Sequence, residues 1–245
     1  MTTAIPIGSL LKFSKGNAKL SQKIFTFSLP AGYSCPGAKE CLSRAGRHSG
    51  EIKDGLETKF RCFAASSEAM YPEVRAQRWH NFDALKGKTT EEMVAIISAS
   101  LPKKATIIRV HVSGDFFNEQ YFDAWLEVAR QNPGRTFYAY TKSLHLWVGK
   151  RDNIPQNFKL NASRGGIHDW MIDTYKLKSA EVVFHPDEAK AKGLEIDHDD
   201  SHAYSGDKSF ALLLHGTQPK GSIASKALSA LRKLGWTGYK KKGNK

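Results

Sequence analysis

The three cysteines of this 245-residue chain, Cys35, Cys41 and Cys62, all fall in one stretch, SCPGAKECLSRAGRHSGEIKDGLETKFRC. Five residues separate the first two and twenty separate the second and third. A disulfide is disfavoured because the first residues do not resemble a secretory signal, so we expect a reducing, cytoplasmic setting. Three buried structural thiols are an alternative, since free cysteine packs as a small hydrophobe. The residues around Cys35 and Cys41 are too polar for core, so a metal centre is the favoured interpretation.

Two kinds of metal centre stay open for these thiols. Three thiolates and a histidine would satisfy tetrahedral zinc, with His48 or His80 as the candidate fourth ligand. Zinc sites usually contain closer pairs such as C-x2-C, which this chain lacks. An iron–sulfur cluster accepts looser spacings, and three cysteines can hold four irons while the fourth iron binds another group or stays open. We therefore expect a 4Fe-4S cluster, with zinc as the alternative, and nearby arginines to offset the thiolate charge.

A second set of polar side chains follows directly on short apolar runs. In parallel sheets the carboxyl ends of the strands meet at one edge, where functional groups collect. The sequence therefore predicts a cleft lined by these residues: Ser113, Asp115, Tyr140, Lys142, Asn161, Ser163, His185 and His215.

For two further clusters a structural role is favoured over a functional one. Strand alternation would place His111, Ser113 and Asp115 on one face, which invites a hydrolytic trio, but a hydrogen-bonded strand end is favoured. The segment DHDDSHAY, from Asp197 to Tyr204, offers carboxylates and imidazoles to a divalent cation. Its polarity favours a solvated loop instead.

The elements that must position these groups alternate between strands and helices. Six apolar, β-branched or aromatic runs predict strands: Lys23–Pro30, Thr106–Gly114, Arg135–Ser143, Phe158–Gly166, Ala180–Pro186 and Phe210–Gly216. Thr89 with Glu92 forms a capping box, and Asn118 and Ser222 are expected to cap two amphipathic helices. This pattern predicts an α/β fold, a single-domain partial or distorted (β/α) barrel with a largely parallel sheet.

Charge is the most unusual bulk property. The chain carries 37 Lys and Arg against 24 Asp and Glu, a formal net charge of +13, which attracts polyanions such as nucleic acid. We expect residues 1–238 to form the barrel-like domain and residues 239–245 a basic tail whose Lys240, Lys241 and Lys242 contact nucleic acid. No apolar run approaches the roughly 18 residues of a membrane span, so no membrane association is expected.

A strand that leads into a three-cysteine loop, followed by further β-α units, resembles the partial barrel of radical S-adenosylmethionine enzymes. Their usual signature is C-x3-C-x2-C. This chain has C-x5-C-x20-C instead, so the signature is absent and the chemistry does not carry over.

A broader resemblance is to the gene product 88 family of phage and plasmid proteins. It is carried by uncommon strings in the same order, among them SKGNAKL, FSLPAGYSCPGAKEC, FRCFAASSEAMYPEVRAQRW, HVSGDFFNEQYFDAWLEVA, FYAYTKS and HGTQPKGS. The resemblance spans nearly the whole chain and implies an origin in a mobile element, without implying an activity.

Two functions therefore remain. The first is a phage- or plasmid-derived metal-binding protein, with an iron–sulfur cluster, that associates with nucleic acid. The alternative is a cluster-dependent enzyme of radical S-adenosylmethionine-like type acting on an unknown substrate.

Overall fold

The computed structural model describes residues 10–16 and 19–236, and the basic tail predicted at 239–245 lies outside them. Eight strands form one sheet, in the order β1-β2-β5-β6-β7-β8-β10-β9. They are β1 (Ser14–Lys15), β2 (Ile24–Ser28), β5 (Ile107–Ser113), β6 (Thr136–Thr141), β7 (Phe158–Ser163), β8 (Ser179–Val183), β9 (Glu195–Ile196) and β10 (Phe210–Leu213). Except for β1, which runs antiparallel to β2, all neighbours are parallel. The predicted α/β class with a largely parallel sheet is confirmed, and all six predicted strands are present.

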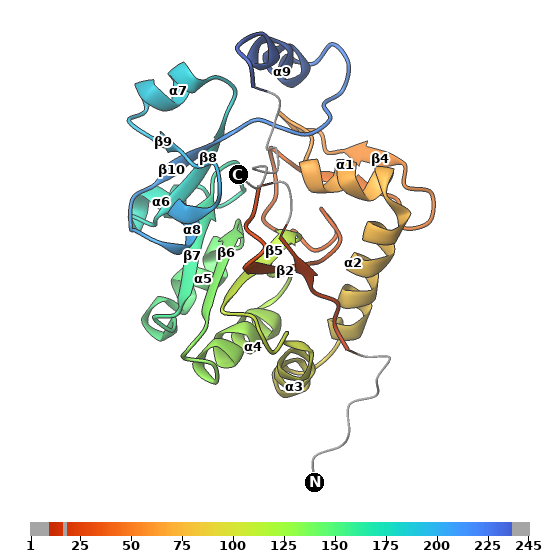
Figure 1. Cartoon of the computed structure of the whole chain (residues 1–245), viewed down its shortest axis with the longest axis vertical. Helices are drawn as coiled ribbons and strands as arrows, with labels where there is room; N and C mark the ends of the chain where they lie inside the picture. The colour runs from red at the N-terminus through yellow and green to blue at the C-terminus, as the bar shows by residue number, and fades with distance from the viewer. Residues whose placement is uncertain (1–9, 17–18, 237–245) are drawn as a thin grey trace.

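Helices connect successive strands (Figure 1). They are α1 (Phe63–Met70), α2 (Pro72–Leu85), α3 (Thr90–Ser100), α4 (Glu119–Arg130), α5 (Leu144–Gly149), α6 (Trp170–Thr174), α7 (Pro186–Ala191), α8 (Ser201–Tyr204) and α9 (Ile223–Lys233). The predicted caps are confirmed: Thr89 and Glu92 form the capping box of α3, Asn118 caps α4 and Ser222 caps α9. A small hairpin of β3 (Ser43–Ala45) and β4 (Ile52–Asp54) lies inside the cysteine segment.

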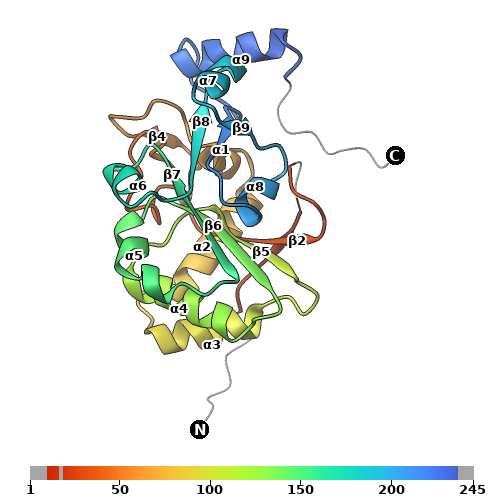
Figure 2. The same cartoon turned by 90° about the vertical axis from the view of Figure 1, so that its left-hand side faces the viewer.

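The two faces of the sheet differ. The outer face, which carries α2, α3 and α4, buries the largest apolar cluster, including Phe27, Trp125 and Phe137. The opposite, inner face carries a smaller cluster around Tyr138 and Phe210, and it is covered by α8 (Figure 2). In the described part of the chain, no helix is long and apolar enough to cross a bilayer.

Strand β5 is irregular at His111, the first residue of the His111, Ser113 and Asp115 trio. His111 adopts a positive φ of 72°, and the pairing of β2 with β5 shifts register beside it. The imidazole turns to the outer face, where its Nε2 lies 2.9 Å from the Tyr121 hydroxyl and its ring packs on Phe116. Burial lowers the pKa of His111 to about 3. His111 is therefore a neutral core histidine bonded to Tyr121, in line with the hydrogen-bonded strand end that the sequence favoured.

Candidate metal centre and adjoining cavity

The loop that carries Cys35 and Cys41 is docked on the carboxyl ends of β6 and β7. The Ile167 amide donates to the Gly37 carbonyl at 3.0 Å, and the Glu40 amide donates to the Gly165 carbonyl at 2.9 Å. A Cβ on Gly37 would stand 2.3 Å from the Lys142 carbonyl oxygen. Glycine is therefore required at position 37 because the loop backbone lies directly against the strand end.

The third cysteine arrives from a helix start. Cys62 immediately precedes α1, and the N–H groups of Ala64 and Ala65 at that helix start act to lower the pKa of its thiol. The Gly32 amide donates to Cys35 Sγ at 3.3 Å. Backbone N–H groups directed at sulfur are the contacts that stabilise thiolates and tune iron–sulfur clusters.

The three thiols share one electrostatic neighbourhood. Burial raises the pKa of Cys35 well above its ordinary value, and negative charge on Asp115, Cys62 or Cys41 raises it further. Burial likewise raises the pKa of Cys62 to about 11, with an added contribution from Cys41. Ionising all three together is costly without a bound cation, and a bound metal would supply that positive charge.

The two candidate fourth ligands, His48 and His80, lie away from the cavity that two of the thiols line. Within the described residues, no group of three or more His, Cys, Asp or Glu side chains is arranged to hold one metal ion. His48 is exposed, and His80 Nε2 lies 2.9 Å from the Leu10 carbonyl oxygen. Neither histidine lines the cavity that Cys41 and Cys62 line.

Glu68 on α1 ties the cysteine segment to the sheet. The side chain is fully buried, and its Oε1 accepts from the Ala31 amide at 2.9 Å, from Arg78 at 2.8 Å and from the Ser113 hydroxyl at 3.2 Å. These bonds fix the loop before Cys35, the helix after Cys62 and the end of β5 relative to one another. Sequence analysis missed Glu68, because nothing in the spacing of SSEAM marks its glutamate as buried.

Asp115, Thr141, Lys142 and Ser163 form what we call the carboxyl-edge cluster. Asp115 accepts from the Phe116 amide at 2.8 Å, from the Thr141 hydroxyl at 2.6 Å and from the Lys142 amide at 2.8 Å. Burial outweighs these bonds and raises the pKa of Asp115 to about 6. Lys142 Nζ donates to the Ser163 carbonyl, the Ser163 hydroxyl and the Arg164 carbonyl at 2.6–2.8 Å. All three acceptors are uncharged, so none of them is a counter-ion to the ammonium.

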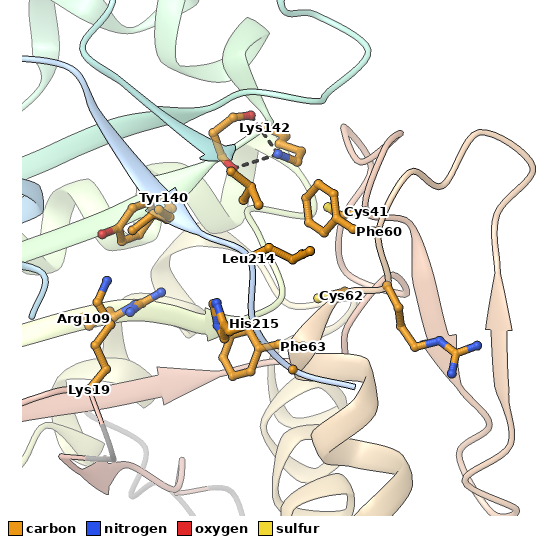
Figure 3. Close-up of a pocket in the computed structure, with 15 residues that line it drawn as sticks. Lys19, Cys41, Phe60, Cys62, Phe63, Arg109, Tyr140, Lys142, Leu214 and His215 are labelled. Atoms are coloured by element: carbon orange, nitrogen blue, oxygen red, sulfur yellow. Dashed lines mark hydrogen bonds between the residues drawn. The ribbon is translucent and has the colours of Figure 1, made fainter. Parts of the chain in front are cut away.

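Beside the thiols lies a cavity of about 470 Å³ (Figure 3). Cys41 and Cys62 are on one side of it, Lys19 and Arg109 are on the other, and Leu214 and His215 lie between them. The full lining is Lys19, Cys41, Phe60, Arg61, Cys62, Phe63, Arg109, Tyr140, Lys142, Ser163, Val182, Leu212, Leu214, His215 and Gly216.

Beneath the cavity, on the inner face of the sheet, Asp200 contacts four side chains. We call Asp200, Lys19, Arg109, Tyr138 and Tyr140 the inner-face cluster. The Asp200 carboxylate lies 2.5 Å from Lys19 Nζ and 2.5 Å from an Arg109 nitrogen, and it accepts from the two tyrosine hydroxyls at 3.0 and 3.1 Å. Burial alone would raise the pKa of Asp200, but the charges of Arg109 and Lys19 outweigh it and hold the pKa below the ordinary value.

The solvated loop expected for DHDDSHAY is therefore wrong for two of its carboxylates. Asp197 and Asp200 are fully buried, because the segment folds over the inner face and its carboxylates meet cations from the Lys19 segment and from β5. The outer residues of the segment, His198 and Asp199, are exposed. The sequence showed the charges but not the distant cations that pair with them.

The structure brings together four of the eight predicted cleft residues: Tyr140, Lys142, Ser163 and His215 line the cavity. Asp115 and Ser113 lie buried beneath the cysteine segment. Asn161 is also buried, and its amide donates to the carbonyls of Ala139 and Ala203. His185 caps α7 and does not line the cavity, because the chain beyond β8 turns into that helix.

Comparison with known proteins adds the family. The model of "Gene product 88" matches residues 10–233. The chain is 26% identical over 163 residues to the Gene 88 protein of Mycobacterium phage L5, covering 60% of this chain and 62% of the relative. It is 26% identical over 148 residues to the Gene 88 protein of Mycobacterium phage D29, covering 54% and 55%. The chain thus matches less than two thirds of either relative's length, and no solved structure matches it.

Proposed function

We propose, for a chain that belongs to the gene product 88 family, that Cys35, Cys41 and Cys62 would hold a 4Fe-4S cluster beside the cavity. The observation that carries the proposal is that two of the three thiols line a cavity at the carboxyl ends of parallel strands. A buried structural cluster would not require such an opening. The function that this arrangement supports best is a cluster-dependent enzyme acting on a small molecule bound in the cavity.

The protein contributes the surroundings of the cluster. N–H groups near Cys35 and Cys62 stabilise sulfur charge, and Lys142 places a cation beside the thiols. An iron that lacks a protein thiol offers a coordination position to a molecule in the cavity. The likeness to the radical S-adenosylmethionine barrel is itself a proposal, supported by sequential parallel strands and a cysteine loop at their carboxyl ends.

The deciding experiment is anaerobic reconstitution with iron and sulfide, followed by metal and sulfide analysis. We expect about four irons and four sulfides per chain, and each of Cys35→Ser, Cys41→Ser and Cys62→Ser should lose most of both. Ser229→Ala, on the exposed surface of α9, is the matched control and should bind normally. Stoichiometric zinc, or three serine variants with full iron and sulfide, would contradict the proposal.

The hypothesis of a cluster-dependent enzyme has a separate test. Adding S-adenosylmethionine to the reconstituted protein should change the electron paramagnetic resonance spectrum of the reduced cluster, because a ligand would occupy the fourth iron. An unchanged spectrum would leave a cluster protein without this co-substrate.

We also propose association with nucleic acid, favoured by the net charge of +13 and by a row of alternating cations and rings. Arg44 lies over the exposed Tyr33, Tyr33 packs on Trp79 with ring centroids 4.9 Å apart, and Arg47 lies over Trp79. Aromatic and arginine planes of this kind stack on unpaired bases.

The measurement is fluorescence anisotropy of a labelled single-stranded oligonucleotide across a salt series. Affinity should fall steeply with salt, and Tyr33→Ala should weaken it several-fold. Tyr175→Ala is the matched control, since Tyr175 is also partly exposed beneath an arginine, Arg151, on another surface. If both variants weakened oligonucleotide affinity equally, this row of cations and rings would not be the binding surface.

A further inference from the structure

The cavity beside the thiols has a one-sided charge. Four cationic side chains line it, Lys19, Arg61, Arg109 and Lys142, and none of the described residues that line it is acidic. Outside the lining, Asp54 pairs with Arg61, and Asp200 pairs with Lys19 and Arg109. Positive groups in a concave site with apolar walls concentrate a positive potential there. The ligand chemistry that matches this lining is anionic.

Two of these cations, Lys19 and Arg109, lie at the end of the cavity away from the thiols, which we call its inner end (Figure 3). Lys19 and Arg109 are both held by Asp200, which lies behind them and does not line the cavity. The Arg109 guanidinium also rests 4.7 Å from the Tyr140 ring centroid. Its Nε is a buried donor with no hydrogen-bond partner among the described residues. An oxyanion at this end would lie beside both cations, Lys19 and Arg109.

The field in the cavity agrees with this geometry. Burial lowers the pKa of His215, which lies between the inner end and the thiols. Lys19 and Arg109 lower it further, and each contributes more than the opposing effect of Asp200. The hydrogen bond to the Leu213 carbonyl acts to raise the pKa of His215, but burial and the two cations outweigh it.

The remaining walls suit a flat apolar body. Phe60, Phe63 and Tyr140 supply rings, with Phe63 packed on His215 at a centroid distance of 4.8 Å, and Val182 and leucines complete the surface. A volume of about 470 Å³ falls within the range of pockets that enclose small organic ligands.

We propose that this cavity binds a small aromatic phosphate monoester of the size of a nucleoside monophosphate, with its phosphate at Lys19 and Arg109. Two converging cations match a dianion, and a guanidinium is suited to phosphate oxygens. The ring lies among the aromatic walls, toward the thiols. That such a molecule is the substrate rests on the proposed cluster function, whereas its binding requires only the folded polypeptide.

The binding test uses three probes on the full chain by isothermal titration calorimetry: uridine 5′-monophosphate, uridine and ribose 5-phosphate. The monophosphate should bind, and removal of either the phosphate or the base should weaken binding at least about tenfold. The proposal would be overturned if the monophosphate did not bind, or if affinity fell only when the base was removed, so that uridine bound as tightly as its monophosphate.

A pair of variants at Val182, one charged and one neutral, tests the site while leaving the Asp200 ion pairs unchanged. Val182 is a half-buried wall residue, and Val182→Asp and Val182→Asn differ in charge but hardly in size. The aspartate variant should bind the monophosphate about ten- to a hundredfold more weakly than the asparagine variant, through repulsion of the phosphate. Circular dichroism and melting temperature check that both fold. Equal affinity in the two folded variants would contradict the proposed site.

Titrations of metal-free and reconstituted protein separate this inference from the cluster proposal. Monophosphate binding by protein that takes up no iron and sulfide on reconstitution would overturn the cluster proposal and leave the ligand proposal standing. Full iron and sulfide content without monophosphate binding would overturn the ligand proposal and leave the cluster proposal standing.

Discussion

Two buried aspartates in this protein are held in opposite ways. Asp115, at the carboxyl edge, receives its hydrogen bonds from two amides and a hydroxyl, whereas Asp200, on the inner face, is held by Lys19 and Arg109 as well as two tyrosines. The pKa of Asp115 is raised by burial to about 6, and that of Asp200 is lowered by its two cations despite burial. Two carboxyls that are both buried therefore differ in proton affinity: Asp115, near the thiols, binds a proton more tightly than usual, and Asp200, under the cavity, binds one less tightly.

The largest expected effect comes from removing the charge of Asp200. Asp200→Asn keeps the shape and tolerates the positive φ of 67° at this position, but it removes the ion-pair partner of Arg109 and the nearer of the two carboxylates beside Lys19. We expect a loss of about 3–5 kcal/mol in the free energy of unfolding, measured by urea denaturation. Asp199→Asn, at the exposed neighbouring position, should change stability by less than about 0.5 kcal/mol. Similar losses in both variants would mean that the cations do not depend on Asp200.

The second expected effect is opposite pH dependence at the two carboxyls. The folded state holds the Asp115 proton more tightly than the unfolded chain does, so this group stabilises the fold below about pH 4 and loses that stabilisation as the pH rises through about 6, by roughly 3 kcal/mol. Asp200 stabilises the fold above its ordinary pKa of 3.8, and its contribution is lost as the pH falls through its lower folded pKa.

Urea denaturation of metal-free wild type and Asp115→Asn from pH 4 to 7 isolates the first contribution as a difference. Buried His111, with its lowered pKa, adds the opposite slope in both proteins and cancels in the subtraction. The difference should change across this window. A difference that stays constant from pH 4 to 7 would show that Asp115 ionises normally.

A third change probes how closely the cysteine loop must approach the carboxyl edge. Gly37→Ala places a methyl group against the Lys142 carbonyl and should cost about 1–3 kcal/mol, with a corresponding loss of bound iron. Gly149→Ala is the control, because its Cβ meets nothing within 4 Å in α5, and alanine should be neutral or stabilise by up to about 1 kcal/mol. Unaltered stability and iron content in Gly37→Ala would mean that the loop can move outward freely.

The smallest expected effect distinguishes the two tyrosines of the inner-face cluster. Tyr138→Phe and Tyr140→Phe each remove one hydrogen bond to Asp200, at about 0.5–1.5 kcal/mol. Only Tyr140 lines the cavity, so Tyr140→Phe should also alter uridine monophosphate affinity, while Tyr138→Phe should not. Altered affinity in Tyr138→Phe at unchanged fold would extend the binding site beyond the cavity lining.

The sequence by itself determined the local elements. Period-two runs and capping residues are local signals, because strand alternation and the first turn of a helix depend on neighbours within a few residues. They sufficed for the six predicted strands, the caps at Thr89, Asn118 and Ser222, and the α/β class. The strand-end rule also led to Tyr140, Lys142, Ser163 and His215, which the structure gathers around one cavity.

The tertiary structure alone decided which charges are buried and with what partners. Asp200 meets Arg109, which lies 91 positions away, and Glu68 meets Ser113, which lies 45 positions away. His111 leaves its expected face because a positive φ and a register shift occur in the middle of the strand. Pairing of this kind depends on how distant segments pack, and the cost of burying a charge is set by the partner that the fold supplies, which no local pattern records.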